Sequence, residues 1–377
     1  MVVYILEVRK PFEPRAMTDP NRPIATGRGA AMSPPNRFES TSFELDLEQL
    51  EHDDDYLDQL RRPPTEYIPD RSRTIVAEND SPDIGFRFSM NPYRGCAHGC
   101  SYCYARPYHE YLGLSAGLDF ETKILVKESA PELLREFLSR DAWRPEPISL
   151  SGVTDCYQPA EREYRLTRAC LEVALAARQP VTIVTKNALI ARDLDILSAM
   201  AALRLVHVSF SITTLDADLA RVMEPRTSTP AARLRAMKVL SKEGVPIRVM
   251  TAPIIPGLNE SEIPALLEAA KDSGARAAGY IMLRLPLAVE PIFLEWLERT
   301  QPLRRTKVEH AIRQVRDGNL SDARFGSRMS GTGVRAAQIA KLFRLFTRRF
   351  KLDGELPELD CSLFRPPRPV IGQLRLF

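Results

Sequence analysis

The sequence predicts an α/β fold, with a parallel sheet arranged as an open or partial barrel of the TIM type. From about residue 84, short apolar runs alternate with stretches that have the apolar period of an amphipathic helix. Continuous apolar strands separated by such helices are typical of a parallel sheet that helices cover. Six or seven of these units follow one another, which fits a partial barrel whose chemistry is expected at the C-terminal ends of the strands.

Each element is predicted from its own segment. The helix at 229–244 has the clearest boundaries, because Thr229 and Pro230 resemble an N-cap followed by proline at the first helical position, and Gly244 suits the end of the helix. The candidate strands are 85–90, 122–127, 148–152, 181–185, 205–212, 247–252 and 279–283. The other candidate helices are 131–139, 161–177, 193–202 and 260–273.

The composition divides the chain into three parts. Residues 1–83 are predicted to be a largely disordered or extended N-terminal arm, because residues 1–40 are rich in Pro, Arg, Gly and Ser and lack periodicity. Within this arm, residues 43–59 are acidic and form either a short surface helix or a solvated segment. The barrel is expected over residues 84–290, and a helical C-terminal extension with a Pro-rich tail over residues 291–377.

Overall charge and hydropathy exclude some classes of protein. The net charge is +3, so the chain is not a polycation and binding to nucleic acid would depend on local patches. There is no run of eighteen apolar residues, and the apolar start of the chain is too short for a signal peptide, so a cytoplasmic protein without a membrane span is expected. In such a protein, clustered cysteines indicate a metal site rather than disulfides.

One local patch is strongly basic. Residues 324–351 contain eight Lys or Arg residues and no acidic residue, and their apolar residues have helical spacing. The segment is either a helix that packs on the barrel with a basic outer face, or a surface that binds phosphates.

Three of the six cysteines lie close together, at Cys96, Cys100 and Cys103, with the spacing C-x3-C-x2-C. Thiolates this close repel one another unless a metal neutralises them. Three thiolates can hold three irons of a [4Fe–4S] cluster and leave the fourth iron open to a substrate or cofactor. The alternative is a structural zinc site with His98 or Cys156 as the fourth ligand.

The segment R-G-C-x-H-G-C-x-Y-C-Y-A-R at 94–106 resembles the radical S-adenosylmethionine (SAM) superfamily, in the branch related to spore photoproduct lyase. The resemblance implies a partial (β/α)6 barrel and a [4Fe–4S] cluster held by Cys96, Cys100 and Cys103. It also implies that the reduced cluster cleaves SAM to a 5′-deoxyadenosyl radical, which abstracts hydrogen from a substrate. A donor such as a flavodoxin or ferredoxin would supply the electron.

The loop at 151–161 follows the third candidate strand and is rich in hydroxyl, carboxylate and amide groups. SAM presents an ammonium, a carboxylate, a ribose and an adenine, so its pocket needs this mixture of groups. Ser151, Thr154 and Asp155 are therefore candidate SAM-binding residues. The resemblance adds Lys186, in a T-K context at the end of the fourth candidate strand, and Ser211 on the fifth. The segments E-P-R-T-S at 224–228 and P-I-I-P-G-L-N at 253–259 also resemble this branch.

One difference from the family concerns the hydrogen donor. Spore photoproduct lyase uses a cysteine just ahead of its SAM-binding loop, whereas residues 150–153 here are L-S-G-V. Cys156 and Tyr157 lie nearby in the sequence and are the candidate catalytic residues. The lyase reaction on a thymine dimer is therefore not implied as directly as the cofactor chemistry.

The substrate has two candidate classes. A DNA lesion, acted on by a lyase-type repair reaction, fits the resemblance and the basic segment, whereas an RNA- or peptide-modifying radical enzyme fits the cofactors equally well. A structural zinc or DNA-binding protein is the non-enzymatic alternative. The C-terminal residues Gln373, Leu374, Leu376 and Phe377 resemble the motif by which bacterial repair proteins bind the DNA sliding clamp, although packing of the tail on the barrel is the simpler alternative.

Overall fold

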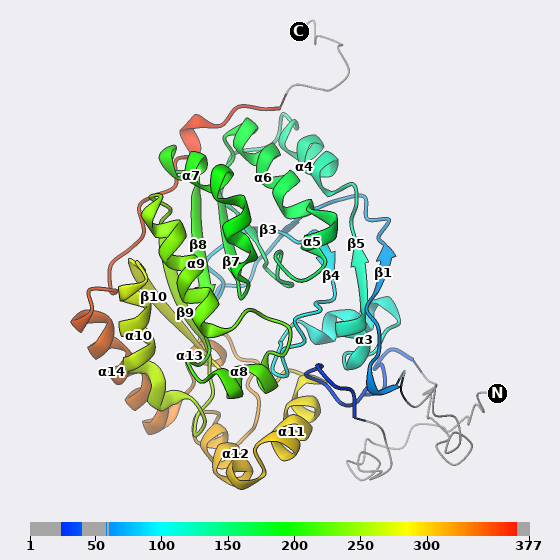
Figure 1. Ribbon diagram of the computed structural model, residues 1–377, viewed down its shortest axis with the longest axis vertical. Coiled ribbons are helices and arrows are strands. Elements are labelled where there is room, and N and C mark those ends of the chain that lie inside the picture. Colours follow the sequence, from blue (N-terminus) through cyan, green and yellow to red (C-terminus); the bar gives the residue numbers. More distant parts are fainter. Residues whose placement is uncertain (1–23, 40–57, 59, 368–377) are drawn as a thin grey trace, which may run out of the picture.

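A computed structural model of the 377-residue chain describes residues 24–39, 58 and 60–367. Its main element is a seven-stranded sheet with the order β10-β9-β8-β7-β6-β3-β2. Figure 1 labels β10, β9, β8, β7 and β3 of this sheet. All neighbours in this sheet are parallel except the edge strand β2, which is antiparallel to β3. The strands are β2 Val76–Glu78, β3 Phe88–Met90, β6 Ile148–Leu150, β7 Val181–Thr185, β8 Val206–Ser211, β9 Ile247–Ile254 and β10 Ala277–Met282. The prediction of a mixed α/β fold with a parallel sheet is confirmed.

A second, smaller sheet has the order β1-β5-β4. It contains β1 (Glu66–Pro69), β4 (Tyr93–Arg94) and β5 (Lys123–Val126). The predicted strand at 122–127 therefore forms, but it pairs with β1 and β4 rather than with the strands of the main sheet. This small sheet flanks the loop that contains the three cysteines, because β4 leads directly into that loop.

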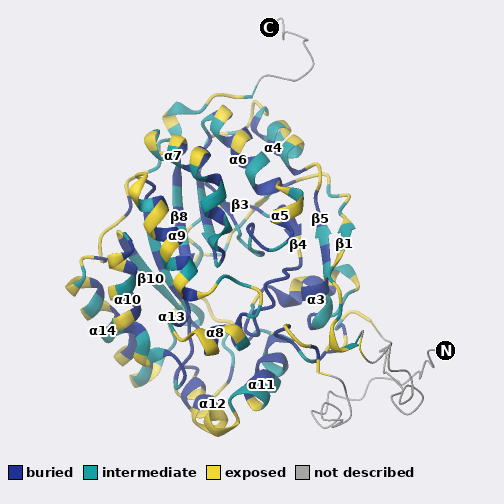
Figure 2. Ribbon diagram, viewed as in Figure 1, coloured by how far each residue is buried: buried dark blue, intermediate teal, exposed yellow. Residues whose placement is uncertain are grey.

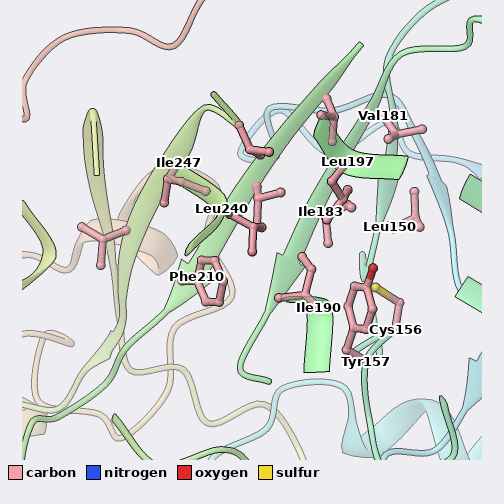
Figure 3. Close-up of a cluster of buried hydrophobic side chains, with 14 of the residues drawn as sticks. Leu150, Cys156, Tyr157, Val181, Ile183, Ile190, Leu197, Phe210, Leu240 and Ile247 are labelled. Atoms are coloured by element: carbon pink, nitrogen blue, oxygen red, sulfur yellow. The ribbon is translucent and has the colours of Figure 1, made fainter. Parts of the chain in front are cut away.

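Helices cover the main sheet and bury its apolar side chains (Figure 2). The core includes Val181, Ile183 and Phe210 from the strands and Leu197 and Leu240 from the helices, as Figure 3 shows. The Thr229 hydroxyl accepts a hydrogen bond from the Ala232 amide, so the predicted N-cap is confirmed. These helices are α4 Ala130–Leu138, α6 Leu166–Ala177, α7 Leu194–Ala202, α9 Pro230–Lys242 and α10 Ile263–Asp272.

Short helical segments join these elements, and longer helices complete the C-terminal part. The 3-10 segments are η2 Arg106–Leu112, η3 Ala188–Asp193, η4 Glu260–Glu262, η5 Pro302–Arg304 and η6 Cys361–Leu363. The remaining α-helices are α3 Leu118–Thr122, α5 Glu161–Tyr164, α8 Ala217–Met223, α11 Val289–Thr300, α12 Arg305–Gln314, α13 Ser327–Ser330 and α14 Gly333–Arg349. In the described residues no helix is long and apolar enough to cross a membrane.

The basic segment 324–351 forms α13 and α14. Helix α14 packs against α10 and α12 through Ala336, Ile339 and Phe343, while Lys341, Arg344 and Arg348 are exposed. The chain after α14 returns to the start of β10, where the Ala278 amide donates to the Leu352 carbonyl. The basic face of α14 therefore ends near the N-terminal end of β10, away from the strand ends where a barrel carries its chemistry.

Residues 24–39 differ from the predicted disordered arm, because they pack against the cysteine loop. Gly29 lies so close to this loop that a Cβ atom there would stand 1.7 Å from the Gly99 carbonyl oxygen. The Gly29 and Ala30 amides both donate to the Glu121 carboxylate, at 3.0 and 2.8 Å. Arg28, which is buried, donates to the Glu121 and Pro63 carbonyls. The structure does not describe residues 1–23, 40–57, 59 and 368–377. Most of the acidic segment at 43–59 and the residues predicted to bind the sliding clamp therefore lie outside the described residues.

Candidate active site

The three cysteines lie in one loop that runs from β4 to η2. Cys96 and Cys100 are buried and Cys103 is partly buried. Two turns shape the loop, because the Gly99 amide donates to the Cys96 carbonyl and the Cys103 amide donates to the Cys100 carbonyl, both at 3.2 Å. Gly95 and Gly99 have φ values of 77° and 65°, and a Cβ at either position would press against neighbouring atoms. The backbone at these two positions therefore requires glycine.

The side chains around the thiols are mostly apolar. Cys96 packs with Phe120, and Cys100 packs with Tyr102 and Met223; Cys103 contacts both groups and so lies between the other two cysteines. Burial raises the pKa of the Cys100 and Cys103 thiols. These two thiols are therefore neutral in the free chain, and binding of a metal has to displace their protons.

Buried polar side chains fix the loop from two sides. The Gln158 side chain accepts from the Ala97 amide at 2.9 Å and donates to the Gly95 carbonyl at 3.0 Å. On the other side, the guanidinium of the buried Arg106 donates to the Cys100 carbonyl and pairs with Glu121. Both Gln158 and Arg106 are completely buried, so their polar atoms have little alternative to these partners and the loop geometry is strongly determined.

His98 joins the cysteine loop to the ends of two strands. Its Nδ1 lies 3.4 Å from Asp155 Oδ2, and its Nε2 lies 3.2 Å from Asn187 Nδ2. Asp155 also accepts from the Thr185 hydroxyl at 2.9 Å and from the Lys186 amide at 2.7 Å. Burial lowers the pKa of His98, but Asp155 and Cys96 raise it more, to about 9. Burial also raises the pKa of Asp155, but His98 holds it below its ordinary value.

A second buried network lies beside Cys100. Glu224 accepts hydrogen bonds from the Tyr102 hydroxyl and, at 2.7 Å, from the Thr213 hydroxyl, and its other oxygen pairs with Arg233 at 2.5 Å. The Lys186 ammonium lies 5.8 Å from the centre of the Tyr102 ring. Burial raises the pKa of Glu224, but Arg233 and Lys186 hold it at about 2, so the carboxylate is ionised.

The structure brings most of the predicted SAM-binding residues to the C-terminal ends of β6, β7 and β8. Lys186 follows β7, and Ser211 ends β8, where its hydroxyl donates to the Ala252 carbonyl at 2.9 Å. In the loop after β6, the Thr154 hydroxyl donates to the Tyr93 carbonyl at 2.8 Å and the Ser151 hydroxyl accepts from the Cys156 amide at 2.8 Å. Ser151 has a φ of 73°, so this loop turns sharply back towards the cysteine loop.

Cys156 and Tyr157 are not brought to this group. Both are completely buried in the apolar core between the sheet and the helices, as Figure 3 shows. The Tyr157 hydroxyl donates to Asp193 at 3.1 Å, and Asp193 pairs with Arg168 and Arg192. The positions of Cys156 and Tyr157 therefore do not support their predicted catalytic role, because both side chains point into the apolar core.

Several residues of this site were missed in the sequence. Gln158, Arg106, Glu121 and Arg233 are buried polar residues that fix the cysteine loop or its neighbour Tyr102. Arg233 lies in the helix α9, where a charged residue is normally expected on the outer face. One signal could have indicated Gln158. The segment G-C-A-H-G-C and the polar loop at 151–161 both follow predicted strands, so a barrel would bring them close together in space.

The donors in the loop fit a [4Fe–4S] cluster. Cys96 and Cys100 lie in two adjoining apolar groups, and Cys103 packs against both. The two side chains that could compete as ligands are engaged elsewhere, because His98 has partners at both ring nitrogens and Cys156 lies in the core. No three Cys, His, Asp or Glu side chains of residues 24–39, 58 and 60–367 are arranged to hold a single metal ion. A cubane makes a different demand, because each of its three protein thiolates binds a separate iron.

A loop with two buried thiols and one partly buried thiol, at the mouth of a partial barrel, could hold a metal cluster through three protein ligands. Comparison with known proteins gives the family. Residues 90–270 match the family model of the radical SAM superfamily, and this part of the chain is a radical SAM domain, as the sequence predicted.

Several known proteins are similar in sequence, among them two uncharacterized proteins. The chain is 37% identical over 221 residues to an uncharacterized protein of Mycobacterium tuberculosis, covering 58% of this chain and 65% of that protein. It is 29% identical over 178 residues to an uncharacterized protein of Methanocaldococcus jannaschii, covering 47% of this chain and 64% of that protein. The matches thus span less than two thirds of either relative.

Among solved structures, the fold is similar to that of spore photoproduct lyase in complex with dinucleoside spore photoproduct. The TM-score is 0.54 and the sequences are 16% identical, over 75% of this chain and 79% of that chain. At this identity the likeness concerns the fold, which is that of the branch predicted from the cysteine segment.

Proposed function

We propose that this protein is a radical SAM enzyme that acts on a lesion in DNA. The observation that carries the proposal is the loop of Cys96, Cys100 and Cys103, which lies beside Lys186 at the strand ends of a radical SAM domain. A [4Fe–4S] cluster with SAM supplies one-electron cleavage of SAM to methionine and a 5′-deoxyadenosyl radical. The electron would come from a small low-potential donor protein such as a flavodoxin or ferredoxin.

The residues of the site have distinct tasks in this proposal. The three cysteine thiolates would hold three irons, and the apolar side chains around them would exclude water. Lys186 would pair with the SAM carboxylate, because its ammonium lies next to Tyr102 and close to Cys100. Asp155 would act indirectly, since its carboxylate already holds His98 and the Lys186 amide in place.

Replacement of Lys186 by alanine is expected to weaken SAM binding by about 2–3 kcal/mol, the range for a charged hydrogen-bonded pair in a partly dry site. Isothermal titration of the reconstituted protein with SAM would measure this loss. Lys242, an ordinary lysine in the last turn of α9, provides a matched control, and Lys242→Ala is expected to bind SAM as the wild type does. Unchanged affinity in Lys186→Ala would remove Lys186 from the SAM pocket.

The DNA substrate is supported by the similarity in fold to spore photoproduct lyase, whose structure contains a dinucleoside photoproduct. An RNA or a peptide would be compatible with the same cofactors. The test is the rate of 5′-deoxyadenosine formation by the reconstituted protein with ultraviolet-irradiated DNA, unirradiated DNA, RNA and a mixed peptide pool. Stimulation by irradiated DNA alone is expected, whereas stimulation by RNA or peptide alone would refute the proposed substrate.

A delivery role for the C-terminal tail belongs to the same proposal. The last described part of the tail lies at the end of the sheet opposite to the cysteine loop, because the Arg365 amide donates to the Ala177 carbonyl just ahead of β7. A partner that holds the tail there would leave the mouth of the barrel open to DNA. Residues 373–377 carry the pattern Q-L-x-L-F, although Arg375 stands where Ser or Asp is common.

Deletion of residues 373–377 is therefore expected to abolish binding to the bacterial sliding clamp, because Leu and Phe would no longer fill its apolar pocket. Titration of labelled clamp with the intact and the shortened protein measures the difference. Equal binding by both proteins, or none by either, would refute the docking role. A lower unfolding temperature of the shortened protein would instead favour a tail that packs on the barrel.

A further inference from the structure

Four exposed aromatic side chains follow one another from the cysteine loop along η2 to the N-terminal segment. They are Tyr104, Tyr108, Tyr111 and Phe38, with 43, 56, 66 and 57% of their surface exposed. The ring centres of Tyr108 and Tyr111 are 6.5 Å apart, and those of Tyr111 and Phe38 are 4.9 Å apart. We call these four residues the aromatic stripe. Exposed large aromatic residues that lie together normally mark a binding surface.

The outer end of the aromatic stripe is fixed before any ligand binds. Asn36 donates to the Glu110 and Leu114 carbonyls at 2.9 and 3.2 Å and accepts from the Phe38 amide at 2.9 Å, so the turn before Phe38 is tied to η2. The Arg37 guanidinium lies 4.6 Å from the centre of the Phe38 ring and 5.2 Å from that of Tyr111. A surface ordered in this way loses little conformational entropy when it binds.

The inner end of the aromatic stripe reaches the mouth of the barrel. Tyr104 directly follows Cys103, and its hydroxyl donates to the Gly152 carbonyl at 2.9 Å in the loop after β6. The Arg284 guanidinium, just past the end of β10, lies 5.8 Å from the centre of the Tyr104 ring. Arg284 contacts the Met329 sulfur at 3.6 Å, and it forms no ion pair with a carboxylate in the part of the chain that the structure describes. Its charge is therefore available to an anion at the mouth.

Tyrosine rings that lie beside guanidinium groups are suited to binding a nucleic acid. Nucleobases stack on aromatic faces, and phosphates pair with arginine, whereas bases that are paired in a duplex do not offer their faces. A protein typically binds a membrane surface through an amphipathic α-helix with Trp, Phe or Leu on its apolar face, whereas the tyrosines here lie on and beside the short 3-10 segment η2. The basic face of α14 also carries arginines, but the large exposed apolar residues of this helix are Val334 and Leu345, and the rings beside Arg349, those of Phe346 and Phe350, are only partly exposed.

We propose that the aromatic stripe binds a polynucleotide through unpaired bases, which stack on Tyr108, Tyr111 and Phe38 while Arg284 pairs with a phosphate next to the cysteine loop. The inference rests on the proposed function and deepens it, because it states which form of nucleic acid the enzyme takes. A strand bound in this way would lead its unpaired nucleotide towards the mouth of the barrel.

The test measures binding to the full-length chain without its cluster or SAM, by fluorescence anisotropy. The probes are a labelled DNA single strand of about 12 nucleotides, within the usual site size of such surfaces, the same sequence as RNA, and the perfectly paired DNA duplex. Polyglutamate serves as an anionic peptide. The variants are Y108A/Y111A, its conservative partner Y108F/Y111F, and the control Leu345→Ala on α14. Circular dichroism checks that each variant is folded.

The wild type is expected to bind the DNA single strand more tightly than the duplex or polyglutamate. Tighter binding of the RNA strand would refute the DNA substrate of the proposed function, but it would still support the stacking of unpaired bases on the aromatic stripe. Y108A/Y111A should bind roughly tenfold more weakly for each ring removed, whereas Y108F/Y111F and Leu345→Ala should bind as the wild type does, because the ring faces remain. Equal binding by Y108A/Y111A, preference for the duplex or polyglutamate, or absence of binding would overturn the inference. Since no SAM is present, these outcomes are independent of whether the reconstituted protein cleaves SAM.

Discussion

Replacement of Cys100 by alanine is expected to abolish both iron binding and SAM cleavage, and replacement of Cys96 or Cys103 should do the same. The loop offers three thiols, and a cubane held by only two of them would lose one of its three protein ligands. Iron analysis after anaerobic reconstitution should give about four irons per chain for the wild type and a background level for each variant. The formation of 5′-deoxyadenosine should fall to background in parallel.

Cys170 provides the matched control for this experiment. It is buried, as Cys96 and Cys100 are, but it lies in α6 among the apolar side chains of the core. Cys170→Ala should therefore keep its iron and its SAM cleavage, with a small loss of stability from the cavity that it leaves. Full activity in Cys100→Ala would contradict the assignment of the cluster, and so would loss of iron in Cys170→Ala alone.

Replacement of Glu224 by glutamine should lower the free energy of unfolding by about 3–5 kcal/mol, the usual cost of breaking a buried ion pair. Glu224 and Arg233 are both buried, and the substitution leaves the guanidinium without its carboxylate. It also changes the acceptor of the Tyr102 hydroxyl next to Cys100, so cluster assembly should become less efficient. Urea denaturation of the cluster-free chain measures the stability.

An exposed ion pair close in sequence provides the control for Glu224. Arg221 and Asp218 form a pair at 3.2 Å on the surface of α8, where water screens the interaction. Arg221→Gln should therefore unfold at the same urea concentration as the wild type. If Glu224→Gln unfolds there as well, the buried network does not stabilise the site in the way that its geometry indicates.

Most of the barrel could be predicted from the sequence, because its strands are continuous apolar runs that only a covered parallel sheet explains. The strand at 122–127 was placed in the wrong sheet, since periodicity identifies a strand but not its neighbour. The packing of residues 24–39 could not be predicted. Gly29 and Ala30 bond to Glu121, more than ninety residues away, and such contacts leave no local pattern in the sequence.

In the candidate site, too, some residues could be predicted from the sequence and others could not. The three cysteines are recognisable from their spacing together with the residues that flank them. Asp155 is recognisable from its place in a polar loop after a predicted strand, and Lys186 from the resemblance to the family. Cys156 and Tyr157 were singled out for their chemistry in a loop near the mouth, but sequence position does not determine towards which side a loop residue points. Arg233 was missed because its partner, Glu224, precedes it on a different element, and only the folded chain shows that α9 turns this charge inward.

We propose above all that this chain reductively cleaves SAM at a cluster held by Cys96, Cys100 and Cys103. The most direct measurement is the amount of 5′-deoxyadenosine and methionine formed when the anaerobically reconstituted protein is incubated with SAM and dithionite, with no other protein present. Both products are expected to form in equal amounts, and neither is expected to form with the triple cysteine-to-alanine variant. A fully iron-loaded and reduced protein that leaves SAM intact would contradict this proposal.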